Sequence, residues 1–197
     1  MFNNDFLNNN TLEFYKQFFS EIPEKSGIYY WVFWPFKDYY LEDENFEIFI
    51  EKIKYFSSVN MNLPERTNVG YKFSIEVRER ALDCEFFGLI NNKSKILIKH
   101  LHESRKNREL FLIYLKKIVF SKPFYIGKAN KLRNRLLQHF EQRNSDILNH
   151  LNEFNINHTD VLIGYEIIES NLDDNINTIF EEIAQRILKP GLTKRPG

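Results

Sequence analysis

The stretch PFYIGKANKLRNRLLQHF, residues 123–140, determines how the rest of this chain is interpreted. Residues 124–126 are strand formers that lie between a proline and Gly127, which predicts a short strand that stops at a turn. From Asn130, a residue type that often caps helices, the pattern becomes helical. We therefore predict a strand that runs through a glycine turn into a helix.

The helical half carries two stripes in which successive members are four residues apart. The apolar stripe is Leu132, Leu136 and Phe140, and the basic stripe is Lys131, Arg135 and His139. Residues four apart share a helix face, so the apolar stripe would pack on the strand and the basic stripe would lie beside it. Such an arrangement suits a phosphate ligand, and it equally fits a surface helix whose charges are solvated.

Two segments of the chain resemble the signature of the GIY-YIG nuclease superfamily. Gly27-Ile28-Tyr29 is similar to the first half, and the Tyr-Ile-Gly-Lys of residues 125–128, followed by Arg135 and His139, is similar to the second half. Glu181 precedes Pro190 on a predicted helix, as the metal-binding glutamate of the family does. The resemblance covers about residues 24–36 and 122–197.

The resemblance implies an α+β fold with a small, mostly antiparallel, three-stranded sheet flanked by helices. It implies one nuclease domain over residues 1–197, in which residues 36–122 are a mixed α/β insertion between the two half-motifs. It also implies a metal-dependent endonuclease that hydrolyses phosphodiester bonds of double-stranded DNA, most similar to type II restriction enzymes of cellular defence. A palindromic recognition site would call for a homodimer.

The resemblance further implies roles for individual side chains. Tyr29, beside Tyr125, would polarise or deprotonate the attacking water, and because a free tyrosine has a pKa of about 10 it needs positive charge from Lys128 or a metal. Arg135 would bind the scissile phosphate through its planar guanidinium. His139 would orient a tyrosine or share in proton transfer. Glu181 would hold one Mg²⁺ or Mn²⁺.

DNA contacts are expected from a further set of side chains on the same segments. This set is Lys128, Lys131, Arg133, Arg135 and Thr193. Thr193 stands where the family usually has an asparagine, so a single hydroxyl replaces an amide.

Helical periodicity separates Glu181 from its neighbour Glu182. The predicted core stripe of this helix is Ile176, Ile179, Phe180, Ile183 and Ile187, extended by Ala184 and Leu188. Glu181 lies beside Leu188 at the edge of this stripe, whereas Glu182 lies on the opposite flank with Gln185. We therefore expect Glu181 to be the shielded, metal-binding carboxylate.

The remaining chain predicts helices and strands at regular intervals. Strands are expected at 28–34, 71–77 and 161–168, with 82–90 pairing to the second, and helices at 11–19, 45–56, 94–102, 108–120, 145–154 and 173–188. Residues 57–69 are expected to form a loop. The insertion is rich in Lys and Arg after residue 92, which fits either a solvated helical face or a DNA-contacting element.

Composition limits the classes of function. Lys+Arg and Asp+Glu number 27 each, yet residues 122–143 hold six bases and one acid, and residues 38–51 hold six acids and no base. A polyanion would therefore bind one side only. One cysteine, no leader-like start and no long apolar run fit a cytoplasmic protein.

The alternative to an active endonuclease is a catalytically impaired protein of the GIY-YIG fold that binds DNA or has a structural role. Other enzyme classes are not favoured, because the sequence has no phosphate-binding loop, nucleophile elbow or cluster of metal ligands.

Overall fold

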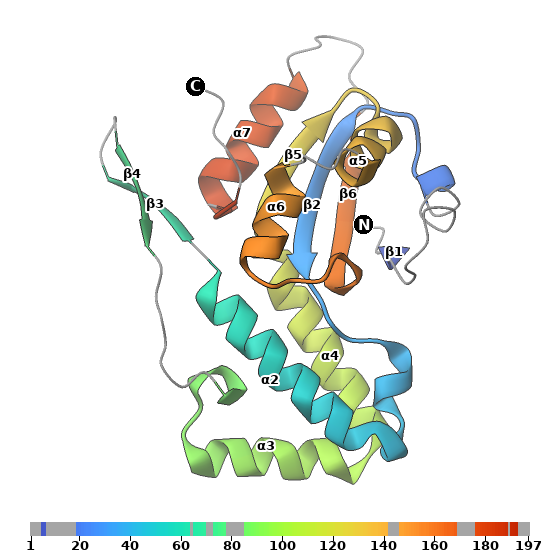
Figure 1. The fold of residues 1–197 in the computed structure, drawn as a ribbon, viewed down its shortest axis with the longest axis vertical. Helices are drawn as coiled ribbons and strands as arrows, with labels where there is room; N and C mark the ends of the chain where they lie inside the picture. Colours follow the sequence, from blue (N-terminus) through green and yellow to red (C-terminus); the bar gives the residue numbers. More distant parts are fainter. Residues whose placement is uncertain are drawn as a thin grey trace.

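The structure is a computed structural model that describes residues 5–6, 19–63, 65–69, 73–77, 85–141, 146–168, 176–188 and 190–192. Its strands are β1 (Asp5–Phe6), β2 (Gly27–Phe33), β3 (Glu65–Val69), β4 (Phe73–Val77), β5 (Tyr125–Ala129) and β6 (Val161–Ile167). Its helices are α2 (Phe46–Asn62), α3 (Asn91–Glu103), α4 (Arg105–Phe120), α5 (Leu132–Glu141), α6 (Asp146–Glu153) and α7 (Ile176–Leu188). Figure 1 shows the sheet at one end and the inserted helices at the other.

The main sheet has the strand order β1-β6-β2-β5, and every pair in it is antiparallel. β2 is flanked on both sides, and all but one of its seven residues are buried, because it consists of apolar and aromatic side chains on both faces. The predicted central strand and the predicted α+β fold are therefore confirmed. β5 is an edge strand of the described sheet, and its outer edge lies against α7.

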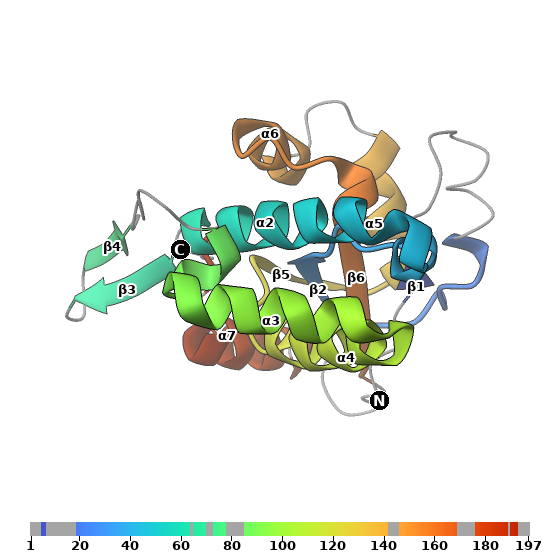
Figure 2. The same cartoon turned by 90° about the horizontal axis from the view of Figure 1, so that it is seen from below.

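Helices cover the sheet from both sides, and Figure 2 shows α5 and α6 on one side and α7 and α4 on the other. On the α5 side, Trp31 of β2 stacks on Phe140 with ring centroids 5.4 Å apart. Leu132 and Leu136 are fully buried there, so the apolar stripe predicted for this helix packs as expected.

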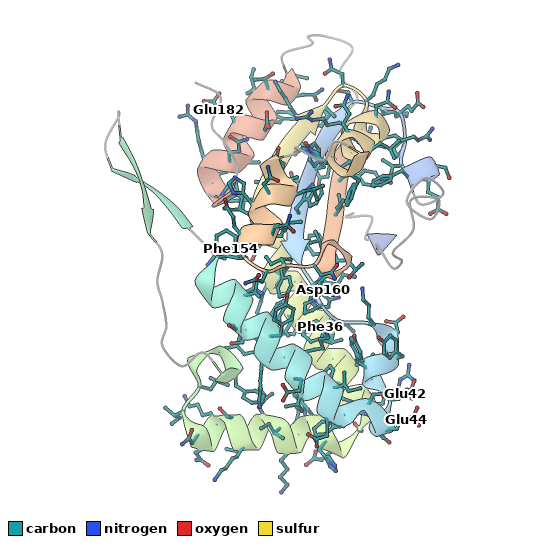
Figure 3. The ribbon with its side chains drawn as sticks, viewed as in Figure 1. Phe36, Glu42, Glu44, Phe154, Asp160 and Glu182 are labelled. Carbon is teal, nitrogen blue, oxygen red and sulfur yellow. The ribbon has the colours of Figure 1, made fainter. Side chains whose placement is uncertain are left out.

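The inserted region packs directly on the end of the sheet and shares its core. Phe33 at the end of β2 stacks on Phe56 of α2 with ring centroids 5.9 Å apart. Figure 3 shows Phe36, Phe154 and Asp160 at this junction, where the backbone N–H of Trp34 donates to the carbonyl of Asp160 over 2.7 Å.

Arg108, one of the basic residues of the insertion, is buried and connects several segments of this region. Its guanidinium is 1% exposed, donates to the carbonyls of Leu41 and Leu101 at 2.9 Å each, and pairs with Asp43. Removing the guanidinium would leave buried carbonyls without donors, so Arg108 serves the packing of α4 and does not face a ligand.

The expectation of a loop over residues 57–69 is wrong. α2 continues to Asn62, because Val59 keeps its apolar stripe in the core and the buried Ser57 hydroxyl accepts the N–H of Phe87 over 2.6 Å. After α2 comes β3, which pairs with β4.

Residues 85–88, expected to belong to a strand that pairs with residues 71–77, instead form a 3-10 turn. The predicted helix over residues 11–19 lies outside the described residues except for Phe19, which is buried against Phe140. Thr193 and Cys84 also lie outside them.

Candidate active site

The two half-motifs meet in the sheet, because β2 and β5 pair with Tyr29 opposite Gly127. A Cβ atom on Gly127 would lie 2.5 Å from Cζ of Tyr29, which is far inside contact distance. Glycine is therefore required for the tyrosine ring to lie across the neighbouring strand. The spacing of the sequence motif thus has a steric reason in this chain.

Tyr29 and Tyr125 lie on the same face of the sheet, diagonally across the β2–β5 pair. Their ring centroids are 6.1 Å apart with an interplanar angle of 32°, and their hydroxyls interact through a hydrogen bond. Two strands that are about a hundred residues apart in sequence therefore bring the two phenols together, as the resemblance implies.

The side chain of His139, from α5, contacts both of these phenols. Its Nε2 is 2.7 Å from the hydroxyl of Tyr29, and its ring lies 5.9 Å from that of Tyr125. Burial, and then the charge of Arg135, lower the pKa of His139 from 6.5 to about 4. A neutral imidazole at pH 7 therefore faces Tyr29, and His139 is not part of a solvated basic stripe.

Arg135, one turn before His139, is exposed on α5 and acts on Tyr29 through its charge and a hydrogen bond. Burial of Tyr29, together with the neighbouring Tyr125, nevertheless raises the pKa of this phenol above its ordinary value. Arg135 only offsets part of that rise. The positive charge expected from Lys128 is not among the influences on Tyr29, because Lys128 faces α7.

Glu181 lies on the side of α7 that faces β5. The backbone N–H of Lys128 donates to its carboxylate, and the side-chain amide of Gln185 donates to it over 3.1 Å. Burial raises the pKa of Glu181, whereas Lys128 and Arg135 act to lower it. Glu181 therefore lies within electrostatic range of Arg135, which also acts on Tyr29.

Lys128 is held by α7, because its ammonium donates to the hydroxyl of Thr178. The same stretch of α7 contributes Asn177, which is buried and donates to the hydroxyl of Ser26. Among the described residues, the side-chain oxygen of Asn177 has no hydrogen-bond partner. Asn177, Glu181 and Gln185 thus form a polar file, each member four residues from the next, that faces the sheet edge.

This polar file overturns the predicted orientation of α7. Ile179, Phe180, Ile183 and Ile187, expected in the core, are exposed, and Gln185, expected on the outer flank, is buried. The cause is the edge of β5, whose outward N–H groups need acceptors, and Glu181 supplies one. The four-residue spacing of the file was the signal in the sequence that could have revealed Gln185.

The expected DNA-contacting residues differ in their surroundings. Lys131 is exposed on α5. Arg133 is tied to the segment before β2 instead, since its guanidinium donates to Ile22 at 2.7 Å, Ser20 at 2.8 Å and Glu24 at 3.1 Å. This network gives Arg133 a structural role, and its DNA contact stays a prediction.

The side chains around Glu181 limit which kind of metal ion this site could bind. Within the described part of the chain, no three His, Cys, Asp or Glu side chains gather as a ready-made metal cage. A lone carboxylate fits Mg²⁺ or Mn²⁺ that keeps most of its waters and takes substrate oxygens as further ligands. It does not fit a tightly held structural metal.

Comparisons of this chain with protein-family models, curated proteins and solved structures found no significant match. Each helix in the described part of the chain is too short or too polar to span a bilayer. The functional conclusion therefore rests on the residues and geometry of the site.

Proposed function

We propose that this protein is a metal-dependent DNA endonuclease of the GIY-YIG type that hydrolyses phosphodiester bonds, similar in role to type II restriction enzymes. One observation supports the proposal: Tyr29, Tyr125, His139 and Arg135, from three separate elements, form one cluster, and the charge of Arg135 also acts on Glu181 of a fourth element. Chance would rarely assemble phenols, a guanidinium, an imidazole and a carboxylate in the roles that phosphodiester hydrolysis requires.

The guanidinium of Arg135 is the group that would bind the scissile phosphate. It is exposed, planar and always charged. Because Arg135 helps to hold the pKa of His139 low, an anionic phosphate on Arg135 would offset that charge and raise the pKa of His139. Substrate binding would thereby make His139 a better proton acceptor at the moment when it is needed.

Tyr29 would act as the relay between the attacking water and His139. Its raised pKa means that it keeps its proton in the free protein, so it cannot serve as a stored phenolate. It would instead donate its proton to Nε2 of His139, 2.7 Å away, while taking one from the water that attacks phosphorus. The bond from phosphorus to the leaving oxygen then breaks, and this oxygen takes a proton from solvent.

Glu181, kept in place by Gln185 and the N–H of Lys128, would hold Mg²⁺ or Mn²⁺. Such an ion supplies positive charge that stabilises the leaving oxygen. The exposed lysines of the α3 segment, Lys93, Lys95 and Lys99, support a contribution of the insertion to DNA binding.

A specific observation favours the second candidate, a protein of this fold that binds DNA without cutting it. Burial raises the pKa of both the proposed relay, Tyr29, and the proposed metal ligand, Glu181, which disfavours the charged forms. Under this alternative, Arg135 and the surface lysines would still bind the DNA backbone.

Plasmid DNA of mixed sequence, incubated with the purified protein and Mg²⁺ or Mn²⁺, separates the two candidates. We expect discrete fragments from a site-specific enzyme, and the Tyr29→Phe variant should slow cutting by about 10²–10⁴-fold, the range for loss of acid–base catalysis. A smear would indicate a nuclease without sequence specificity. Intact DNA with both metals, together with salt-sensitive binding, would establish the binding protein.

A further inference from the structure

The apolar side of α7 is exposed on the surface of the molecule. Four large side chains on its outer face are exposed to 43–71%, namely Ile179, Phe180, Ile183 and Ile187. An amphipathic helix gains its stability from burying such a stripe, yet here the opposite, polar side is buried against β5. Within the part of the chain that the structure describes, the stripe therefore lacks the cover that its composition calls for.

The apolar surface continues from α7 onto the sheet. A hollow of about 540 Å³ lies between the helix and the end of β6, and apolar side chains such as Ile28, Ile168 and Ala184 line it. Ile167 beside it is 42% exposed. Helix and hollow together form one continuous apolar face, here called the α7 face and defined by Ile167 and the four stripe residues.

We propose that the α7 face is the interface through which two copies of this chain form a symmetric dimer. Three of the four stripe residues are symmetric in sequence about Ile183, since Ile179 lies four residues before it and Ile187 four residues after it, whereas Phe180 has Arg186 as its counterpart. In an antiparallel pair of α7 helices, Ile183 meets its own counterpart and Ile179 meets Ile187 of the other copy. A two-fold axis requires such self-complementarity.

The area of the α7 face is sufficient for a second copy. Five large apolar side chains, each with roughly 200 Å² of surface and each about half exposed, offer on the order of 500 Å² per copy. Two copies would bury about 1,000 Å², the size at which specific interfaces begin. The hollow beside the stripe would add to this area by receiving side chains of the other copy.

Charge also favours a second copy over nucleic acid. Glu182, labelled in Figure 3, and Arg186 border the stripe and neutralise each other, with Nε of Arg186 donating to Glu182 over 3.1 Å. A surface that binds DNA is strongly positive, whereas this one is mainly apolar and its hollow also holds the acidic side chain of Glu166. The dimer would place DNA-binding residues on the remaining surfaces and would give two sites per particle.

The mass of the full-length protein in solution tests the proposal without reference to nuclease activity. We expect about twice the chain mass of 23.8 kDa by light scattering at micromolar concentration. Ile183→Asp should raise the dissociation constant at least about 100-fold, because two carboxylates would meet at the axis. Ile96→Asp is the matched control, since Ile96 is 62% exposed on α3 at the far end of the molecule, and it should leave the dimer intact.

Cross-linking provides a second measurement that does not depend on a destabilising charge. In a Cys84→Ser background, Ile183→Cys should form a reducible covalent dimer under mild oxidation, whereas Ile96→Cys should not. A wild-type protein with the mass of one chain at tens of micromolar would overturn the proposal. So would a dimer that Ile183→Asp does not weaken, or equal cross-linking of the two cysteine variants.

The dimer and the nuclease can fail separately in these experiments. A monomeric protein that cuts DNA overturns only the dimer, and a dimer that leaves DNA intact overturns only the nuclease. If both proposals hold, Ile183→Asp should retain the single-strand nicking of each site and lose the paired cuts that linearise a plasmid.

Discussion

α5 and α7 lie on opposite sides of the same sheet, and the apolar stripe is buried on one helix and exposed on the other. On α5, Leu132 and Leu136 are buried against β2, as their periodicity predicts. On α7, the corresponding stripe around Ile183 is exposed, and a file of polar side chains that includes Glu181 faces β5. The two helices have similar amphipathic patterns, so the pattern alone does not explain the difference.

The difference lies in what each helix covers. α5 lies over a face of the sheet, where β2 presents apolar and aromatic side chains. α7 lies over β5 on the other side of the sheet, and its polar file reaches the free edge of this strand. β5 is not paired to a further strand of the described sheet, and its edge presents backbone N–H groups such as that of Lys128. An edge needs acceptors where a face needs apolar cover. Helix amphipathicity therefore predicts the buried side only when the surface below it is known.

The largest expected effect is on DNA cleavage, and it compares a residue on the inner side of α7 with its neighbour on the outer side. Glu181→Ala should lower cleavage by more than about 10³-fold, because it removes the proposed metal ligand, while DNA binding persists. Glu182→Ala, the matched control one residue away, should leave cleavage nearly unchanged. Plasmid cleavage and filter binding at one salt concentration measure both variants. Equal activity of the two would remove Glu181 from the mechanism.

The next prediction tests whether His139, on the α5 side of the sheet, is buried and neutral. Because the fold holds the pKa of His139 near 4 and the unfolded chain has the ordinary value of 6.5, only the unfolded state gains this proton between these pH values. Stability should therefore fall as pH drops from about 6.5 to 4, by up to about 3 kcal/mol from this residue. Denaturant unfolding across this range measures the loss.

The matched variant for this pH dependence is His139→Gln, which removes the titrating group but keeps a polar side chain. Its stability should change less between pH 6.5 and 4 than that of the wild type. An unchanged pH profile would show that another group causes the loss.

Gly127→Ala tests the contact between the two half-motif strands. The added methyl group would clash with the ring of Tyr29, 2.5 Å from its Cζ atom, and overpacking of this kind costs about 1–3 kcal/mol. Combining it with Tyr29→Ala should remove most of that cost, which a double-mutant cycle of unfolding free energies measures. Purely additive effects would show that the tyrosine ring does not lie over residue 127.

The smallest expected effect concerns the polar file that faces β5. Gln185→Leu keeps the volume of the side chain but removes the donor to Glu181, so the Mg²⁺ concentration for half-maximal cleavage should rise about 10-fold, at the low end for loss of an orienting partner. The maximal rate at saturating metal should change little. A lower maximal rate with an unchanged metal requirement would assign Gln185 to packing alone.

Much of the site could be predicted from the sequence because it follows local rules. The strand and the helix of residues 123–140 form as predicted, and their order along the chain places Arg135 and His139 on one helix. The turn predicted at Gly127 is wrong, because β5 continues through this glycine to Ala129 and Gly127 pairs with Tyr29 of β2.

Glu181 contacts the backbone of Lys128, whereas Glu182 pairs with Arg186, and both glutamates are partly buried. The apolar stripe that serves as the reference for predicting a shielded Glu181 faces outward, so that argument is wrong. The error arose because periodicity yields an angle between residues but not the direction of the core.

Other features depended on partners that are distant in sequence. Arg133 looks like one more cation on a basic helix, yet it binds the segment before β2, and Arg108 of the insertion closes a buried network. The extension of α2 beyond residue 57 depends on Phe87, thirty residues later, which donates to Ser57. No local pattern reports such contacts.

The sequence by itself determined the central strand, the four-residue steps of α5 and α7 and the chemical types of the site residues, because these depend on neighbours within a few positions. The tertiary structure alone decided that His139 is buried and neutral, that Lys128 turns to α7, and that the apolar side of α7 faces outward. Those outcomes depend on which surface each helix covers, and the long-range pairing of β2 with β5 sets that surface.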